Sequence, residues 1–168
     1  MHLETYELLD RLNLKYQPYE HEPVLDYETA AMVDEKYHIE GVESKSLLMK
    51  TKSGKYYLLI TTSDQRMDRK YMKQLLGEKV SIAAPEELME LAGYEAGCAA
   101  PFCYPKEVGF LVDTYLFTLD KIIISAGIST LLLSPFLKQI NCPVPADIQC
   151  QYWYFHNKDI FQFLSVPL

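Results

Sequence analysis

Residues 93–106 concentrate turn-forming and small side chains between two regular segments. This stretch contains two glycines and two prolines, Gly93, Gly97, Pro101 and Pro105. Glycine adopts backbone conformations that other residues rarely reach, so a turn at 97–101 can bring main-chain N–H and C=O groups close to a ligand. Long irregular segments inside compact domains are often functional. We therefore predict that this loop binds a ligand through its backbone.

Cys98 lies inside the same loop, and a cysteine thiolate is a strong nucleophile. A catalytic cysteine needs a base beside it, such as His21 or His156, and nothing in the sequence indicates that arrangement. We favour the interpretation that the Cys98 thiol shapes the loop and that His21 is a turn or core residue. No CxxC pair or zinc-type Cys/His spacing occurs among the cysteines, so we expect no metal: Cys98, Cys103, Cys142 and Cys150.

Charge is distributed unevenly along a chain whose net charge is -7. Residues 1–43 hold 3 basic and 11 acidic side chains, residues 44–79 hold 9 and 3, and residues 80–168 hold 4 and 9. Affinity for phosphates comes chiefly from Lys and Arg, although such residues on hairpin tips and helices are often only solvated. The candidates for contact with a nucleic-acid backbone are Lys50, Lys52, Lys55, Arg66, Arg69, Lys70 and Lys73.

Hydrophobic periodicity and turn signals predict the elements that position these residues. Helices are expected over residues 3–12, 27–37, 69–76 and 85–92, with a short one starting at Pro135. Strands are expected over 14–20, 44–50, 56–62, 79–83, 109–112, 121–125 and 130–133. The order is irregular rather than strictly alternating, which favours an α+β domain with a mainly antiparallel mixed sheet flanked by helices.

Length and composition favour one ordered domain. The chain has 168 residues, of which 49% are hydrophobic, enough for a sizeable core and too few for a second full domain. The N-terminus has no basic region followed by an apolar core, and no apolar run approaches the roughly 20 residues that span a bilayer. We therefore expect a cytoplasmic protein.

Three stretches in a fixed order resemble the YbaK family of prolyl-tRNA editing domains. The first is His21-Glu22-Pro23 after an opening helix and strand, and the second is Glu43-Ser44-Lys45-Ser46-Leu47-Leu48-Met49 ahead of a hairpin. The third is the loop 93–102, similar to the GxxxP loop of that family. The resemblance covers roughly residues 3–140. It implies a single editing domain over 1–140, with residues 141–168 as a C-terminal extension packed on it.

The resemblance also implies an activity and a set of site residues. Members of the family hydrolyse the ester of mischarged tRNA without a metal or cofactor, so the implied partner is tRNA, with no membrane and no DNA. The implied catalytic residues are Lys45, Gly97, Cys98 and Ala99. The implied substrate-binding residues are Ser46, His21, Pro101, Phe102, Ser129 and Thr130. Two departures stand out, because Ser46 replaces the usual Asn and residues 125–130 contain no His.

Three hypotheses of function follow from the sequence. The leading one is a deacylase acting in trans on tRNA-Pro that carries a small amino acid, since a synthetase pocket rejects smaller near-isosteres poorly. The alternative is a catalytically inactive YbaK-fold module that binds an amino acid, a nucleotide or a protein partner. A third is an interaction protein that assembles through the aromatic stretch 152–155. The sequence fixes neither the amino acid, nor the tRNA, nor the oligomeric state.

Overall fold

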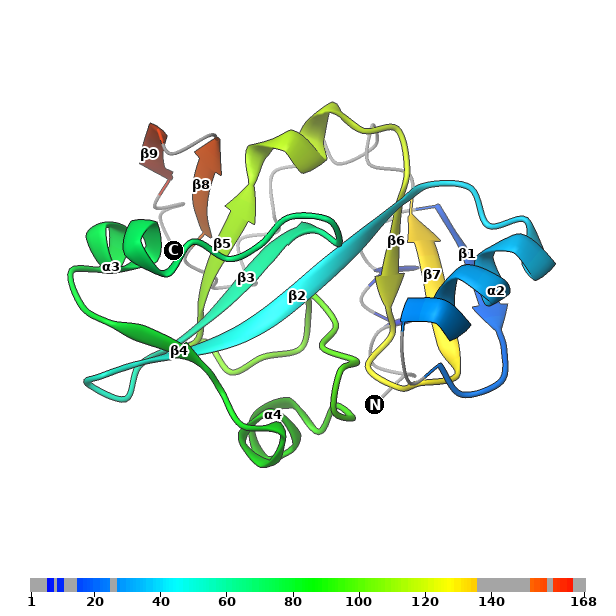
Figure 1. The fold of residues 1–168 in the computed structure, drawn as a ribbon, viewed down its shortest axis with the longest axis horizontal. Helices are drawn as coiled ribbons and strands as arrows, with labels where there is room; N and C mark the ends of the chain where they lie inside the picture. The colour runs from blue at the N-terminus through cyan, green and yellow to red at the C-terminus, as the bar shows by residue number, and fades with distance from the viewer. Residues whose placement is uncertain are drawn as a thin grey trace.

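The computed structural model describes residues 6–7, 9–10, 15–24, 27–135, 152–156 and 159–164. Its helices are α2 (Tyr27–Tyr37), α3 (Arg69–Leu76), α4 (Pro85–Ala92) and the 3-10 helix η1 (Thr114–Thr118). Its strands are β1 (Tyr16–Glu20), β2 (Val42–Thr51), β3 (Tyr56–Thr62), β4 (Val80–Ile82), β5 (Gly109–Asp113), β6 (Ile122–Ser125), β7 (Leu131–Pro135), β8 (Tyr152–His156) and β9 (Asp159–Leu164). Figure 1 shows these elements around one curved sheet.

The described strands form a mixed sheet with the order β1-β7-β6-β2-β3-β5-β8-β9, and β4 pairs with β2 beside this path. Five pairings are antiparallel, namely β1–β7, β2–β3, β2–β4, β6–β7 and β8–β9. Three are parallel, namely β2–β6, β3–β5 and β5–β8. The predicted α+β class with a mainly antiparallel mixed sheet is therefore confirmed.

One edge of β2 is paired only at its two ends. Val42 and Glu43 pair with β6, and Met49 to Thr51 pair with β4. Between these segments no strand of the described residues pairs with β2 on that side, while its opposite edge pairs with β3 from Ser44 to Lys50. The sheet thus contains a gap that is bordered by β6, β2 and β4.

Local signals in the sequence account for the two helices beside the sheet. The Asp68 carboxylate accepts hydrogen bonds from the amides of Lys70 and Tyr71 and caps α3, which ends at Gly77 in the left-handed region. Helix α4 has Pro85 in its first turn and ends at Gly93, also left-handed. Both helices therefore begin and end where the sequence predicts.

Most predicted strands lie within one or two residues of the observed ones. Strand β2, for example, starts at Val42 rather than Ser44 because Val42 and Glu43 pair with β6. The predicted first helix falls mostly outside the described residues, of which 6–7 and 9–10 are helical. The helix predicted from Pro135 also lies outside them, since Pro135 is the last residue of β7. No helix in the described ranges is long and apolar enough to cross a membrane.

The central strands bury side chains on both faces. Leu58 and Ile60 of β3 belong to the larger core cluster, whereas Leu59 between them packs with Tyr71 and Met72 of α3. Successive side chains of a strand point to opposite faces, so β3 needs cover on both sides. Helix α3 covers one face, and the larger cluster, which includes Tyr94 from the loop after α4, fills the other.

Gly127 in the β6–β7 turn supports a close contact with this core. Its φ is +96°, and a Cβ built there would overlap Cδ1 and Cε1 of the Tyr94 ring. Gly54 in the β2–β3 turn also has a positive φ, +87°, but a Cβ there would meet nothing within 4 Å.

We predict that Gly127→Ala lowers the free energy of unfolding by about 2 kcal/mol more than Gly54→Ala does. Both variants carry the cost of a left-handed alanine, about 1–2 kcal/mol, and only Gly127→Ala adds overpacking, typically 1–3 kcal/mol. Urea denaturation of both variants measures the difference. Equal losses would show that the contact between Gly127 and Tyr94 does not constrain the turn.

Candidate functional site

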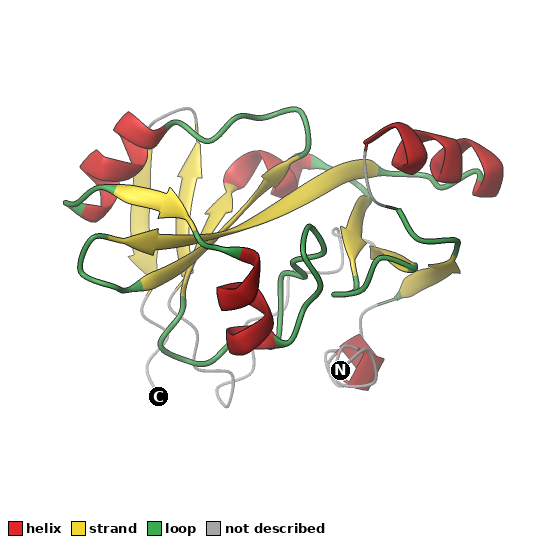
Figure 2. Cartoon of the chain, turned by 60° about the horizontal axis from the view of Figure 1, so that its bottom comes forward, coloured by secondary structure: helices red, strands yellow, loops and turns green. Residues whose placement is uncertain are grey.

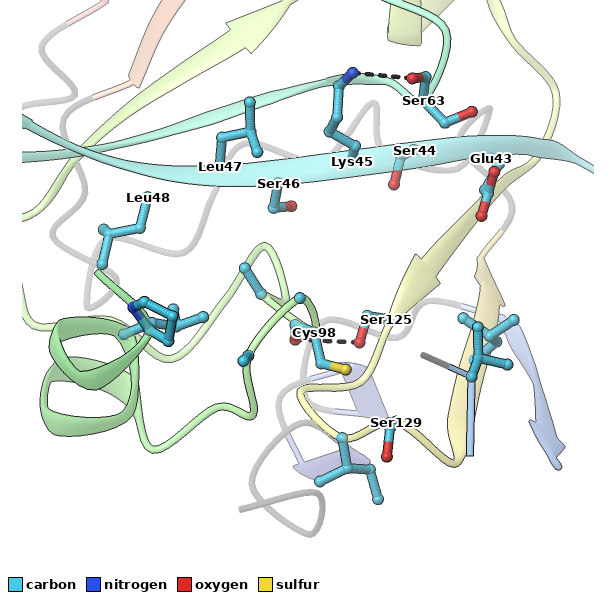
Figure 3. A pocket seen from close by; sticks show the side chains of 18 of the residues that line it. Glu43, Ser44, Lys45, Ser46, Leu47, Leu48, Ser63, Cys98, Ser125 and Ser129 are labelled. Carbon is cyan, nitrogen blue, oxygen red and sulfur yellow. Dashed lines mark hydrogen bonds between the residues drawn. The ribbon is translucent and has the colours of Figure 1, made fainter. Parts of the chain in front are cut away.

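A cavity of about 460 Å³ occupies the gap in the sheet. This volume lies within the range of about 300–1,000 Å³ that is usual for small-molecule sites. Its walls come from β2, the first turn of α4, residues 96–99 of the loop after α4 and the β6–β7 hairpin, with His21 and Val24 at one side. Figure 3 shows Ser44 and Ser46 of β2 extending toward the loop that carries Cys98.

Residues 97–99 line this cavity and include two main-chain donors that are unused in the described part of the chain. Gly97 has a φ of +80°, which glycine adopts without strain. Within the described part of the chain, the N–H groups of Gly97 and Ala99 donate no hydrogen bond, whereas the Cys98 N–H donates to Glu95 O at 3.0 Å. Two free amides on either side of an occupied one form a site that can bind an oxyanion or a carbonyl oxygen.

Hydrogen bonds to the β6–β7 hairpin hold the loop in place. The Glu95 carboxylate accepts from the Ser129 N–H at 2.8 Å, and the Glu95 N–H donates to Gly127 O at 3.1 Å. The Ser125 hydroxyl donates to Cys98 O at 3.1 Å (Figure 3). The hydrogen bond from Ser129 lowers the pKa of Glu95, so the carboxylate is charged at neutral pH. Loop and hairpin therefore behave as one wall of the cavity.

Cys98 is suited to packing rather than to nucleophilic attack. Burial raises the pKa of the Cys98 thiol, and the charge of Glu95 raises it further. A thiol with a raised pKa supplies little thiolate at neutral pH. The predicted role of Cys98 in shaping the loop is compatible with this environment.

Lys45 leaves β2 on the opposite side from the loop, as Figure 3 shows. Its ammonium donates to Ser63 O at 2.9 Å and also to Gln65 O. Burial lowers the pKa of Lys45, the charge of Asp64 opposes this effect, and the charge of Arg66 adds to it. The ammonium is therefore held by the carbonyls of Ser63 and Gln65, across β2 from the loop that carries Cys98 (Figure 3).

The backbone of β2 also contributes to the cavity. Glu43 O accepts from the Ser63 N–H at 2.8 Å on the β3 side, and Leu48 O accepts from the Ala83 N–H at 2.8 Å on the other side. Hydrogen-bonding residues alternate along an antiparallel strand, so the main-chain groups of Ser44 and Ser46 are directed into the gap. A ligand in the gap can thus bind to a strand edge as well as to the loop.

The first turn of α4 is fixed on the sheet by Glu87. Its carboxylate accepts from Lys50 Nζ at 2.5 Å, from the Tyr56 hydroxyl at 2.6 Å and from the Ala84 N–H at 2.8 Å. The hydrogen bond from Lys50, then those from Tyr56 and Ala84, lower the pKa of Glu87 to about 2. Ala84 and Pro85 line the cavity, so this ion pair positions one of its walls.

The structure brings together seven of the ten residues that the sequence assigns to catalysis or substrate binding. These line the cavity: Lys45, Gly97, Cys98, Ala99, Ser46, His21 and Ser129. Pro101, Phe102 and Thr130 are not among its lining residues. Phe102 O instead accepts from the Tyr94 hydroxyl at 2.6 Å, and Thr130 O accepts from the His21 N–H at 3.0 Å. Phe102 and Thr130 thus fix the segments that carry the lining residues.

His21 packs at the side of the cavity with its ring fixed. Nδ1 lies 2.7 Å from Glu22 O, and since a carbonyl only accepts, Nδ1 is the donor. Nε2 is buried and has no hydrogen-bond partner among the described residues. The predicted turn position of His21 agrees with these contacts, and its ring contributes to the wall.

Six of the seven predicted phosphate-binding residues are exposed, and the seventh forms an ion pair. Lys52, Lys55, Arg66, Arg69, Lys70 and Lys73 are exposed, whereas Lys50 is paired with Glu87. The β2–β3 turn and the α3–β4 junction are joined by Lys52 N–H to Lys79 O at 3.0 Å and by Ser53 to Glu78 at 2.8 Å. Apart from Arg66, the exposed set therefore gathers at one end of the molecule, with α3 (Figure 1).

Three acidic residues of the site have no role assigned to them by the sequence analysis. Glu95 and Glu87 anchor the loop and α4, and Glu43 lines the cavity. Only Glu87 has a recognisable sequence pattern, because a Glu three residues after the N-cap residue often accepts a hydrogen bond from the N-cap N–H. Among the described residues, no three His, Cys, Asp or Glu side chains are grouped to hold a metal ion.

Comparison with known proteins agrees with this geometry. A family model described as the aminoacyl-tRNA editing domain matches residues 21–139, well over half of the chain. The chain belongs to the aminoacyl-tRNA editing domain family. The match includes β2, the loop after α4 and the β6–β7 hairpin, which are the segments that form the cavity.

Two curated relatives resemble this editing domain in sequence. The prolyl-tRNA editing protein ProX of Acetoanaerobium sticklandii is 32% identical over 98 residues, which cover 56% of this chain and 57% of that protein. The uncharacterized protein YwhH of Bacillus subtilis is 26% identical over 109 residues, which cover 62% of this chain and 69% of that protein. The chain thus matches little more than half the length of ProX.

Solved structures share the fold of the editing domain. The crystal structure of a hypothetical protein matches with a TM-score of 0.70 and 23% identity, over 82% of this chain and 91% of that one. The crystal structure of a proposed trans-editing enzyme for prolyl-tRNA synthetase matches with a TM-score of 0.67 and 22% identity, over 82% and 87%. The YbaK-like fold that the sequence predicts is therefore confirmed.

We predict that the stability difference between the wild type and Glu87→Gln depends on pH. The pKa of Glu87 is lowered from an ordinary 4.5 to about 2, so its charge stabilises the fold fully above pH 4.5 and progressively less as the pH falls toward 2. Urea denaturation midpoints at pH 7 and pH 3 measure this change. The control is Glu90→Gln, an exposed residue of the same helix. A difference that does not change with pH would contradict the prediction.

Proposed function

We propose that this protein is an aminoacyl-tRNA deacylase that acts in trans and hydrolyses the ester of a mischarged tRNA without a metal. The observation that carries the proposal is the pair of free amides at Gly97 and Ala99, two residues that line the cavity of a member of the editing family. An aminoacyl ester is activated, so binding, a placed water and donors for the oxyanion suffice for its hydrolysis.

In the proposed reaction, the ester carbonyl oxygen accepts from the Gly97 and Ala99 amides. Water attacks the carbonyl carbon, the bond to the ribose oxygen breaks, and the proton of the water passes to that oxygen, which releases the amino acid and the tRNA. Because the amides are fixed by the loop, the negative charge of the tetrahedral intermediate is stabilised without rearrangement of the site. No covalent intermediate with Cys98 is needed.

We propose that the amino acid on the tRNA has a small, uncharged side chain. The inner wall of the cavity is apolar and is formed largely by Leu48, Leu88, Ile123, Ile128 and Leu132. Such a wall admits a side chain by size and offers no partner for a charged one. The curated relative ProX is named a prolyl-tRNA editing protein, so we propose tRNA-Pro carrying alanine, serine or cysteine as the first substrates to test.

We propose that tRNA contacts two places, the rim of the cavity and the end of the molecule that carries the β2–β3 turn and α3. Lys45 and Arg66 stand together at the rim, where their charges suit a phosphate near the acceptor end. The exposed residues Lys52, Lys55, Arg69, Lys70 and Lys73 continue this positive potential along the β2–β3 turn and α3. Lys50 is left out because it is already paired with Glu87.

We predict that the wild type deacylates at least one mischarged tRNA-Pro faster than it deacylates Pro-tRNA-Pro. Gly97→Ala reduces kcat for that substrate by tenfold or more, because a left-handed alanine displaces the loop amides, each of which is worth about 10²–10³ in rate at such sites. Lys45→Ala lowers kcat/KM through the loss of the phosphate contact. Release of labelled amino acid from each charged tRNA measures both effects.

Gly77→Ala is the matched control for Gly97→Ala. The φ values are +76° and +80°, and neither site has an atom within 4 Å of a Cβ built there, so both variants carry the same backbone strain. Only Gly97 lies in the cavity wall. If both variants lose activity equally, the effect is on stability, and if no charged tRNA is hydrolysed faster than in buffer, the deacylase proposal fails.

We predict that Lys73→Gln raises KM for the tRNA roughly threefold at about 0.1 M salt and reduces the salt dependence of binding by about one phosphate contact. The control is Lys36→Gln, which removes the same charge from the last turn of α2. Helix α2 lies at the opposite end of the sheet from α3 (Figure 2). Equal effects of the two substitutions would refute a tRNA surface on α3.

A further inference from the structure

Glu43 supplies an unpaired carboxylate to a cavity that is otherwise mainly apolar and neutral. Glu43, Lys45 and His21 are the acidic and basic residues that line the cavity, among the residues that the structure describes. The Lys45 ammonium is bound to the carbonyls of Ser63 and Gln65. The Glu43 side chain makes no hydrogen bond or ion pair within the same part of the chain.

The backbone holds Glu43 at a fixed place in the gap. Glu43 O accepts from the Ser63 N–H at 2.8 Å, and Glu43 pairs with Ile123 of β6. It is the last residue of β2 that pairs with β6, so its side chain lies where the gap begins. The side chain is partly buried, which strengthens its interaction with a cation compared with one in bulk water.

Lys45 is not a salt-bridge partner of Glu43 in the described part of the chain. The charges of Asp64 and Glu43 both raise the pKa of Lys45, and Asp64 has the larger effect. The Asp64 carboxylate is itself held by the Thr62 hydroxyl at 2.6 Å. Glu43 thus has no hydrogen-bond or salt-bridge partner in the described part of the chain, so a cationic group of a ligand in the cavity can bind it.

The geometry points to Glu43 as the residue that binds the α-ammonium group of the aminoacyl ester. This inference rests on the proposed function and deepens it, since it assigns a second contact of the aminoacyl end besides the loop amides. The α-ammonium is attached to the carbon next to the ester carbonyl. A carboxylate at the β6 end of the gap and two amides on the loop therefore orient the ester from two sides.

The test uses two hydrolysis-resistant adenosine analogues in which a 3′-amide replaces the ester. One carries an alanyl group with its α-ammonium, and the other carries a lactyl group with a hydroxyl at the same position. We expect Glu43→Gln to weaken binding of the alanyl analogue about tenfold and to change binding of the lactyl analogue less than twofold. Isothermal titration with each analogue measures the dissociation constants.

Glu35→Gln is the matched control, because Glu35 is an exposed glutamate on α2 and does not line the cavity. Equal weakening of both analogues by Glu43→Gln would show a structural role and overturn the inference, as would no change for either. Failure of the deacylase proposal is a separate result. In that case no charged tRNA is hydrolysed, while the alanyl analogue still binds in a manner that depends on Glu43.

Discussion

The structure depends on an interruption in the hydrogen bonding of β2. This strand is paired along its whole β3 edge, but its other edge is paired with β6 only at the start and with β4 only at the end. Main-chain polar groups between these ends need partners, because an unpaired backbone group away from water is costly. The gap is therefore a place where water or a polar ligand completes the sheet, and the cavity is its direct result.

Carboxylates anchor two walls of that cavity. Glu87 ties the first turn of α4 to β2 and β3, and Glu95 ties the loop to the amide of Ser129. Each anchor uses charge-assisted hydrogen bonds, which are stronger than neutral ones. The reactive surface itself is mostly backbone and apolar side chains. The hydrogen bonds of Glu87 and Glu95 thus fix the walls from outside the cavity, and the space inside is available to a ligand.

Elements with local signals were predictable, and contacts between distant segments were not. The caps at Asp68, Gly77 and Gly93 determine α3 and α4 from neighbouring residues. The parallel pairings of β2 with β6 and of β3 with β5 join residues far apart in sequence, and no local pattern encodes them. The direction of the Lys45 side chain depends on the register of β2 with β3. The sequence therefore identified Lys45 as a site residue but did not predict which way its side chain points.

The loop and the hairpin that close the gap contribute no hydrogen bonds to the long central ladder between β2 and β3. Their lengths and side chains can therefore change over evolutionary time while the β2–β3 ladder and the packing of α3 stay the same. The buried residues of the loop and the hairpin, such as Tyr94 and Leu133, belong to the core. Gly97 and Ser129, which line the cavity, are not part of that core, so the side chains that border a ligand can change while the packing of the core is kept.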